Sequence, residues 1–156
     1  MSTLIRGFAK AHESCKRLRL VIAGDGEERE KLGALAKELG VEREVTFAGW
    51  ISGGMDRFYS TLDINALTSL SETFPYALTE GARFHLATVA TAVGGIPYLI
   101  DQNVNGYLFT AGDWEALGSY LAALGSNDSL RHEMGKRLYE KASSKFSIQS
   151  TVDTQL

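Results

Sequence analysis

Short apolar runs alternate with amphipathic segments along most of the chain. The runs that predict strands cover residues 18–23, 45–48, 64–67, 88–91 and 107–109. Apolar positions at helical spacing predict helices in residues 3–12, 32–39, 55–62, 75–84, 114–124 and 130–138. Strands that alternate with helices in this way predict a parallel sheet with helices on both faces. The fold class is therefore α/β, with one Rossmann-like domain over residues 1–156.

The boundaries of these elements carry their own signals. Gly40 follows the last apolar residue of its helix and is predicted to end it, and Asp113 is predicted to cap the helix that follows it. The first element is a helix, whereas a doubly wound domain ordinarily opens with a central strand. A first strand is therefore predicted to be missing.

Composition and charge narrow the function classes. Hydrophobic residues make up 44% of the chain and charged residues 22%, which is typical of a folded globular domain. Sixteen basic and nineteen acidic residues give a formal net charge of −3, which does not favour nucleic acid or anionic lipid as a partner. Any phosphate binding must therefore be local.

The lone cysteine and the apolar runs also bear on the environment of the chain. Cys15 lies among apolar positions of the first predicted helix, which predicts a buried, inert thiol. No stretch has the length of a membrane span or the character of a signal peptide. The expected location is the cytoplasm.

The loop after the first predicted strand contains Gly24 and Gly26, where a dinucleotide fingerprint would lie. The third small residue of that fingerprint is replaced by Arg29, which disfavours a nicotinamide cofactor. Two interpretations remain open: a tight turn between strand and helix, or a turn that also lets the backbone approach a ligand.

A stronger signal is the run from Ser69 to Glu80, which follows another predicted strand. Pro75 suits a first helical turn because it has no N–H to satisfy. The amides of Tyr76, Ala77 and Leu78, with the positive end of the helix dipole, are then placed to hold a diphosphate without a lysine.

Two carboxylates bracket that predicted helix start. Glu72 precedes it, and Glu80 lies about 7.5 Å along the axis from Pro75. Each carboxylate can accept two hydroxyl hydrogen bonds, as a vicinal diol of a sugar or ribose requires. The alternative is that Glu72 is an ordinary acid at a helix terminus and Glu80 a solvated helix residue.

Together these segments resemble the group 1 glycosyltransferase domain, the carboxyl-terminal half of retaining GT-B enzymes of the GT4 type. Three pieces carry the resemblance: LVIAGDGEE with VTFAGW, the E-x7-E element from Glu72 to Glu80, and VATAVGGIP with NVNGYLF. Their order and spacing, from about Leu18 to Phe109, are more specific than any one piece.

The resemblance implies roles for individual residues. Glu72 would be the catalytic residue that contacts the donor sugar, and Glu80 would bind the ribose. Trp50 and Ile51 would border the base, although an ordinary surface aromatic explains Trp50 equally well. The segment that would border the diphosphate and sugar comprises Thr73, Phe74, Pro75, Tyr76, Ala77 and Leu78.

Several features depart from the family pattern. The arginine and lysine that hold the diphosphate in the family would precede Met1, as would the amino-terminal domain that supplies the acceptor site. His85 and Ala87 replace a glycine and a proline, and Tyr98 replaces a glutamate. His85 is expected to be a capping or core histidine rather than a catalytic base.

The resulting expectation is a domain that binds a UDP-sugar or another NDP-sugar for retaining hexosyl transfer, as in bacterial surface polysaccharide biosynthesis. No metal or other cofactor is expected, and membrane contact is expected only through the missing half. Alone, the chain is expected to be inactive. Two alternatives stay open: half of a UDP-sugar epimerase, or a non-catalytic nucleotide-binding or signalling module whose acidic pair would be Asp25 and Asp63.

Overall fold

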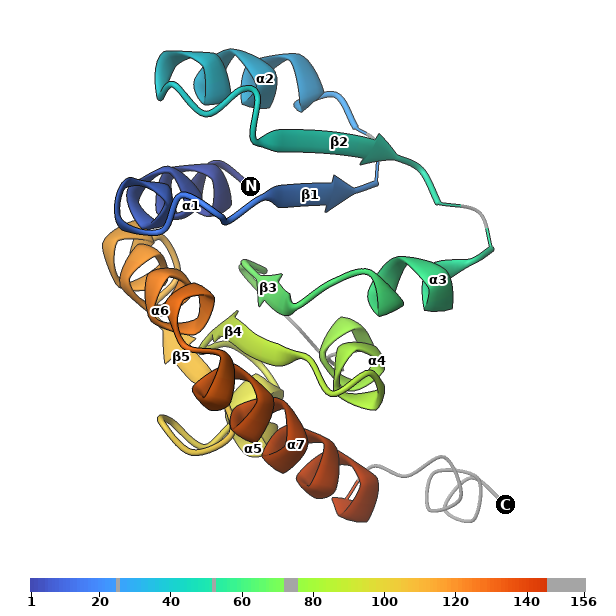
Figure 1. The fold of residues 1–156 in the computed structure, drawn as a ribbon. Coiled ribbons are helices and arrows are strands. Elements are labelled where there is room, and N and C mark those ends of the chain that lie inside the picture. The colour runs from blue at the N-terminus through green and yellow to red at the C-terminus, as the bar shows by residue number, and fades with distance from the viewer. Residues whose placement is uncertain (25, 52, 72–75, 146–156) are drawn as a thin grey trace.

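The computed structural model describes residues 1–24, 26–51, 53–71 and 76–145, and it shows strands alternating with helices (Figure 1). The elements are α1 (Ser2–Ser14), β1 (Leu20–Ala23), α2 (Arg29–Glu38), β2 (Val45–Gly49), α3 (Met55–Ser60), β3 (Ile64–Leu67), α4 (Tyr76–Arg83), β4 (Ala87–Thr91), α5 (Ile96–Leu99), β5 (Tyr107–Phe109), α6 (Trp114–Ser126) and α7 (Asp128–Lys145). All the predicted strands and helices are confirmed, with ends that shift by a few residues. The short helix α5 was not predicted.

The strands form two parallel sheets. β1 pairs with β2, and β4 pairs with β3 on one side and β5 on the other. In the described part of the chain, no strand pairing joins β1 to β3. The predicted parallel α/β architecture is confirmed, but its sheet is divided between β1 and β3.

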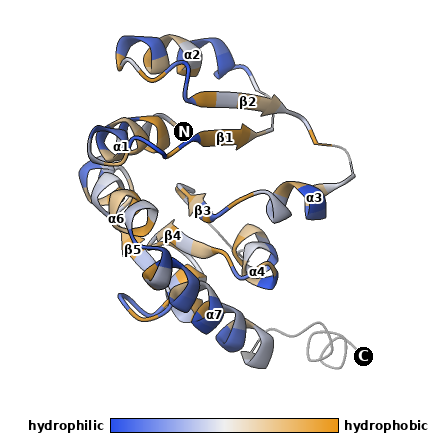
Figure 2. Cartoon of the chain, viewed as in Figure 1, coloured by the Kyte–Doolittle hydropathy of each residue, from blue (hydrophilic) through white to orange (hydrophobic). Residues whose placement is uncertain are grey.

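Helices cover both faces of the larger sheet, as β4 shows. Val89 belongs to a hydrophobic cluster that includes Phe8 of α1 and Leu117 of α6. Ala90, the next residue, belongs to a second cluster that includes Leu78 of α4. Because successive side chains in a strand point to opposite faces, the two clusters lie on opposite sides of the sheet. Figure 2 shows the contrast between hydrophobic β4 and the largely hydrophilic α2 and α7.

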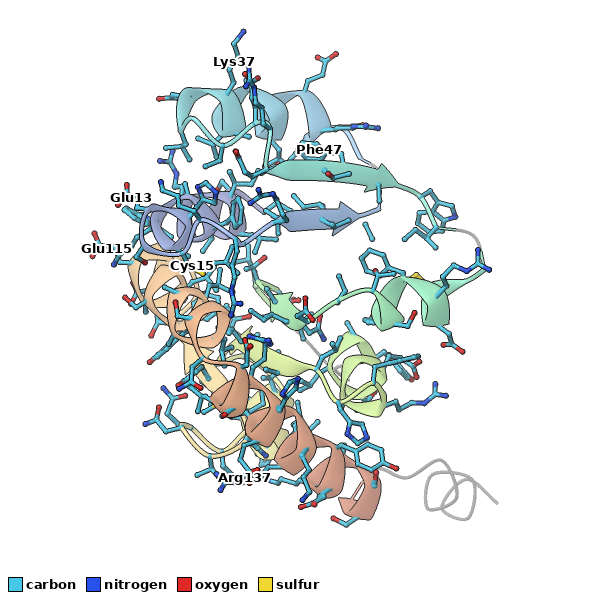
Figure 3. The ribbon with its side chains drawn as sticks, viewed as in Figure 1. Glu13, Cys15, Lys37, Phe47, Glu115 and Arg137 are labelled. Carbon is cyan, nitrogen blue, oxygen red and sulfur yellow. The ribbon has the colours of Figure 1, made fainter. Side chains whose placement is uncertain are left out.

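The two sheets are held together through α1 and α6 rather than through strand pairing. A Cβ added to Gly7 of α1 would lie 2.7 Å from the Leu117 side chain of α6, so the two helices meet at very close range. Beyond the end of α1, the Arg17 guanidinium donates to Asp128 at the start of α7 across 2.7 Å. Cys15, labelled in Figure 3, is buried as predicted.

Local signals at three helix ends behave as predicted. The Asp113 carboxylate accepts a hydrogen bond of 3.1 Å from the Ala116 amide and so caps α6. Gly40 follows α2 with a φ of 77°. His85 follows α4 with a φ of 58°, and the amides of His85 and Leu86 donate to Ala82 and Gly81. This is the hydrogen-bond pattern of a Schellman cap, which confirms His85 as a capping residue.

Over the described residues, no helix is both long enough and apolar enough to cross a bilayer.

Candidate functional site

The carboxyl ends of β1 and β2 meet at one edge of the smaller sheet. The Gly24 amide donates to the Gly49 carbonyl across 2.7 Å, and Gly24 has a φ of 105° that a residue with a side chain rarely adopts. The hydrogen bond joins the ends of the two strands, and both interpretations of the loop after β1 stay open. Gly26 is exposed beyond it, and Asp25 lies outside the described residues.

Arg29, which occupies the third position of the failed dinucleotide fingerprint, has a packing role. Its guanidinium lies over the Phe47 ring of β2, 5.6 Å from the ring centroid. Figure 3 labels Phe47 on the strand next to α2. A glycine at this position would lose that contact.

Trp50 follows β2 directly and projects from the same edge. Its side chain is 78% exposed and is one of the largest apolar groups on the described surface. The Ile51 side chain is half-buried. A flat aromatic surface at this position suits a nucleobase. It suits a protein interface equally well, so the predicted base contact stays a prediction.

The ends of β3 and β4 are joined at their own carboxyl edge. The Thr91 hydroxyl donates to the Ser69 carbonyl across 2.6 Å, which ties the end of β4 to the segment after β3. Gly94 and Gly95 follow in the loop after β4, and Tyr98 on α5 is exposed. The end of β4, which Gly94 and Gly95 follow, therefore lies beside Ser69.

Helix α4 begins next to this edge. Tyr76 is exposed and Ala77 half-buried, whereas the Leu78 side chain is fully buried in the smaller cluster. Leu78 can therefore offer a ligand only its backbone. Four residues of the predicted site, Glu72, Thr73, Phe74 and Pro75, lie outside the described residues.

Asn65 of β3 fixes the position of this helix, and sequence reasoning did not single it out. The residue is buried, and its Nδ2 donates to the Ala77 carbonyl across 3.1 Å. A Cβ added to Gly81 would overlap the Asn65 amide, so α4 lies directly on this side chain. A polar residue within the otherwise apolar run of β3 was the signal that could have revealed it.

Glu80 lies on α4 and is only half-buried. Its Oε2 accepts a hydrogen bond of 2.9 Å from Arg83. Burial, and secondarily the negative charge of Glu80, raises the pKa of Tyr59 on α3. Tyr59 and Glu80 therefore lie near each other, and the Tyr59 ring stacks on Phe84 with centroids 5.9 Å apart.

The remaining titratable candidates lie elsewhere. His85 stacks on Tyr139 of α7 with ring centroids 4.1 Å apart, and it lies beyond the carboxyl end of α4, at the opposite end of that helix from Tyr76. Asp63 immediately precedes β3, so it lies at the amino end of that strand, away from the edge where an acidic phosphoacceptor cluster was expected. Over the described residues, no three histidine, cysteine, aspartate or glutamate side chains gather closely enough to hold a metal.

The fold and the site are those of an α/β domain with a Rossmann-like parallel arrangement, whose candidate residues follow the carboxyl ends of the strands. A family model described as "Glycosyl transferases group 1" matches residues 1–141. The chain therefore belongs to the group 1 glycosyltransferase family.

A curated relative gives the scale of the full-length proteins. The lipopolysaccharide core biosynthesis glycosyltransferase LpsE of Rhizobium meliloti is 29% identical over 154 residues, which are 97% of this chain and 45% of the relative. The chain thus spans less than half the length of this relative.

Solved structures confirm the GT-B type of fold. The carboxyl-terminal domain of the group 1 glycosyltransferase LpcC from Francisella tularensis superposes with a TM-score of 0.87 at 24% identity, covering 95% of this chain and 80% of that one. Anabaena HepE, in complex with UDP and glucose, superposes with a TM-score of 0.86 at 23% identity, covering 98% of this chain and 43% of that one.

Proposed function

We propose that this chain is the donor-binding half of a retaining glycosyltransferase and that it binds a UDP-sugar or another NDP-sugar at the carboxyl ends of its strands. The observation that carries the proposal is that three features each follow the carboxyl end of a strand: Gly24 after β1, the exposed Trp50 after β2 and the start of α4 after β3. In open α/β sheets, ligands bind beyond the carboxyl ends of the strands. HepE, a protein of the same fold, is seen in complex with UDP and glucose, which supports this ligand class.

The start of α4 would hold the diphosphate. The first turn of a helix presents amides that have no acceptor within the helix, and the helix dipole places positive potential there. The backbone amides of Ala77 and Leu78 belong to this turn. Asn65 fixes that turn through the Ala77 carbonyl, so the donors would be positioned before the ligand arrives. Preorganised donors of this kind stabilise the negative charge that develops on a leaving diphosphate.

The two carboxylates would hold the sugar ends of the donor. Glu80 would accept hydrogen bonds from the ribose hydroxyls, and its hydrogen bond with Arg83 would orient the carboxylate for that role. Glu72 would contact the donor sugar and act as the catalytic carboxylate. Trp50 and Ile51 would border the base, and Gly24 and Gly26 would allow close approach of the backbone. No metal or other cofactor forms part of this proposal.

The full reaction would need a second domain. LpsE extends well beyond the matched region, and the proposal assigns the acceptor site to the part of the protein outside these residues. That part would also make any peripheral membrane contact, with the present domain in the cytoplasm. The reaction would transfer a hexose to a glycan or glycolipid of the bacterial surface, and the isolated chain would not turn over.

Calorimetric titration of the chain with UDP, GDP and ADP tests this proposal. We expect one of them to bind with a dissociation constant in the millimolar range. Glu80→Gln should weaken that binding about tenfold, because a hydrogen bond to a charged group contributes about 1.5 kcal/mol or more. Glu140→Gln, at an exposed position of α7, is the matched control and should leave binding unchanged. Binding that is absent at millimolar nucleotide, or equally strong in both variants, would overturn the proposal.

The epimerase alternative would give a different product. An enzyme completed with its second domain should transfer the sugar to an acceptor if it is a transferase. An epimerase would instead return an NDP-sugar with one inverted carbon and need no acceptor. Product analysis by mass spectrometry and NMR distinguishes the two. The signalling alternative has lost support, because Asp63 lies at the amino end of β3.

A further inference from the structure

Helices α3 and α4 meet through four side chains that contact one another in sequence: Tyr59, Phe84, Arg83 and Glu80. We call them the Glu80 cluster. Arg83 Nη1 donates to Glu80 Oε2 across 2.9 Å, and the same guanidinium lies over the Phe84 ring, 6.0 Å from its centroid. The Phe84 ring stacks on the Tyr59 ring, with centroids 5.9 Å apart and 19° between the planes. The cluster therefore runs from a carboxylate on α4 to a ring on α3, and Figure 1 shows these two helices as neighbours.

Tyr59 attaches the cluster to the fold. The residue is only 7% exposed, so its ring has little freedom to move. Burial, and secondarily the negative charge of Glu80, raises the pKa of the Tyr59 hydroxyl, so the carboxylate at the far end of the cluster lies near the tyrosine at its base. Tyr59 thus provides a fixed surface against which Phe84 packs.

The ion pair at the other end of the cluster is exposed to solvent. The Arg83 and Glu80 side chains are 50% and 41% exposed. An exposed pair of this kind contributes little to the free energy of unfolding, because water and salt screen the charges. Its effect on the position of the carboxylate is larger, since an unpaired glutamate side chain moves among several rotamers. The pair therefore restricts where the Glu80 carboxylate lies.

We propose that Arg83, held in place by the stacked rings of Phe84 and Tyr59, is a positioning residue for Glu80 and sets the strength with which the site selects a ribose carrying both hydroxyls. This inference rests on the proposed function, in which Glu80 binds the ribose. It adds that the selectivity depends on three side chains that do not touch the ligand.

Preorganisation accounts for this effect. Fixing a flexible side chain when a ligand binds costs affinity, and a carboxylate that is already held avoids part of that cost. Each carboxylate oxygen has two lone pairs, so Glu80 can keep its hydrogen bond with Arg83 while it accepts from two hydroxyls. The face of the Phe84 ring attracts the guanidinium and so keeps Arg83 beside Glu80.

The test compares two ligands in each variant. UDP, GDP and ADP are each titrated alongside the 2′,3′-dideoxy counterpart, which lacks both ribose hydroxyls, and NMR gives the dissociation constants. The base and the diphosphate are common to both ligands, so the ratio of the two constants reports only the contact with the hydroxyls. A substitution that merely disturbs the fold weakens both ligands alike and leaves this ratio unchanged.

Two substitutions act on the cluster, and a third is the matched control. Arg83→Leu removes the guanidinium, and Phe84→Leu removes the ring between Arg83 and Tyr59. Arg137→Leu breaks a comparable helix pair on α7, in which Arg137 lies 3.0 Å from Glu133 and has a side chain that is 48% exposed. The thermal midpoint of each variant is measured as well, and that of Arg83→Leu should stay close to that of the parent chain because its ion pair is exposed.

We expect the parent chain to prefer the ribonucleotide by about tenfold or more, since the hydroxyls donate to a charged group. Arg83→Leu should lower this preference by about threefold, through weaker binding of the ribonucleotide alone. Phe84→Leu should lower it by about twofold, because the guanidinium loses its contact with the ring. Arg137→Leu should leave the preference unchanged.

The Glu80→Gln variant separates this inference from the proposed function. If Glu80→Gln lowers the preference but Arg83→Leu or Phe84→Leu leaves it unchanged, the positioning role is overturned and the proposed function stands. A fall of the same size in Arg137→Leu would assign the effect to the net charge of the chain and also overturn the positioning role. Equal binding of both ligands by the parent chain, or a preference that Glu80→Gln does not alter, would contradict the ribose contact itself.

Discussion

The larger and the smaller sheet are both parallel, but they differ in how their strands are enclosed. In the larger sheet, β4 lies between β3 and β5, and Val89 at its centre is fully buried. In the smaller sheet, β1 has a strand on one side and a cavity on the other, and Val21 is 38% exposed. The comparison indicates that the stability of the fold is concentrated around β4, while the β1 and β2 region depends on α1 and its contact with α6.

The largest expected contrast is between two helical glycines, one in each region. A Cβ added to Gly135 of α7 would overlap the His85 carbonyl, and backbone atoms yield little. Gly135→Ala should therefore destabilise the chain by about 3 kcal/mol. A Cβ on Gly33 of α2 would meet no atom within 4 Å, so Gly33→Ala should stabilise it by about 0.5 kcal/mol through helix propensity. Urea denaturation measures both, and two changes of the same sign would contradict the comparison.

A second contrast uses the same substitution in two strands. Val89→Ala should lower the free energy of unfolding by about 2 kcal/mol, because it removes buried methyl groups and leaves a cavity. Val21→Ala, at a partly exposed position, should lower it by less than about 1 kcal/mol. Equal losses would mean that β1 is as enclosed as β4.

The helix ends of the two regions give a smaller and more local contrast. Gly40 and His85 both adopt a positive φ after their helices, although only glycine does so without strain. The His85→Gly variant should have a free energy of unfolding about 1 kcal/mol higher than that of His85→Ala. Both substitutions remove the stacking on Tyr139, and the two variants differ only in the Cβ. Gly40→Ala should cost a similar amount. Equal thermal midpoints of His85→Gly and His85→Ala would show that the backbone there carries no strain.

The smallest expected effect concerns the ion pair that links the two regions. Hydrogen bonds from Arg17 and then Arg131 hold the pKa of Asp128 below its ordinary value of 3.8. Because the folded-state pKa is the lower one, the pair stabilises the fold above pH 3.8 and loses its effect as pH falls below it. The Arg17 and Asp128 side chains are exposed, so the effect of their ion pair should be small. Asp128→Asn should flatten the dependence of the thermal midpoint on pH in this acid range, and an unchanged dependence would contradict the assignment.

Local patterns predicted most of the fold correctly. The apolar runs at β1 to β4 ended at glycines or polar residues, and Asp113 and Gly40 marked their helix ends because capping depends on neighbouring residues. Helix α5 was not predicted, since its four residues are too few to show a helical period. The position of β1 opposite β3, and hence the cavity, depends on tertiary packing.

The candidate site was less predictable for the same reason. Glu80 and Trp50 were identified in the sequence through motif spacing and resemblance. Asn65 and Tyr59 were identified only in the structure, through their interactions with residues of α4. Asn65 lies 12 positions before the carbonyl that it binds, and the proximity of Tyr59 to Glu80 links two different helices. Contacts between elements are set by how the helices pack on the sheet, and a sequence pattern within one element does not reveal them.

The most direct measurement of the central claim is an NMR titration of the isotope-labelled chain with UDP. The proposal predicts that chemical shifts change at Gly24, at the Trp50 indole and at Ala77 in the first turn of α4, with saturation in the millimolar range. The amides of Glu133 to Glu140 on α7 should remain unchanged as an internal control. Changes confined to α7, or none at any site with millimolar UDP, GDP or ADP, would contradict donor binding at the carboxyl ends of these strands.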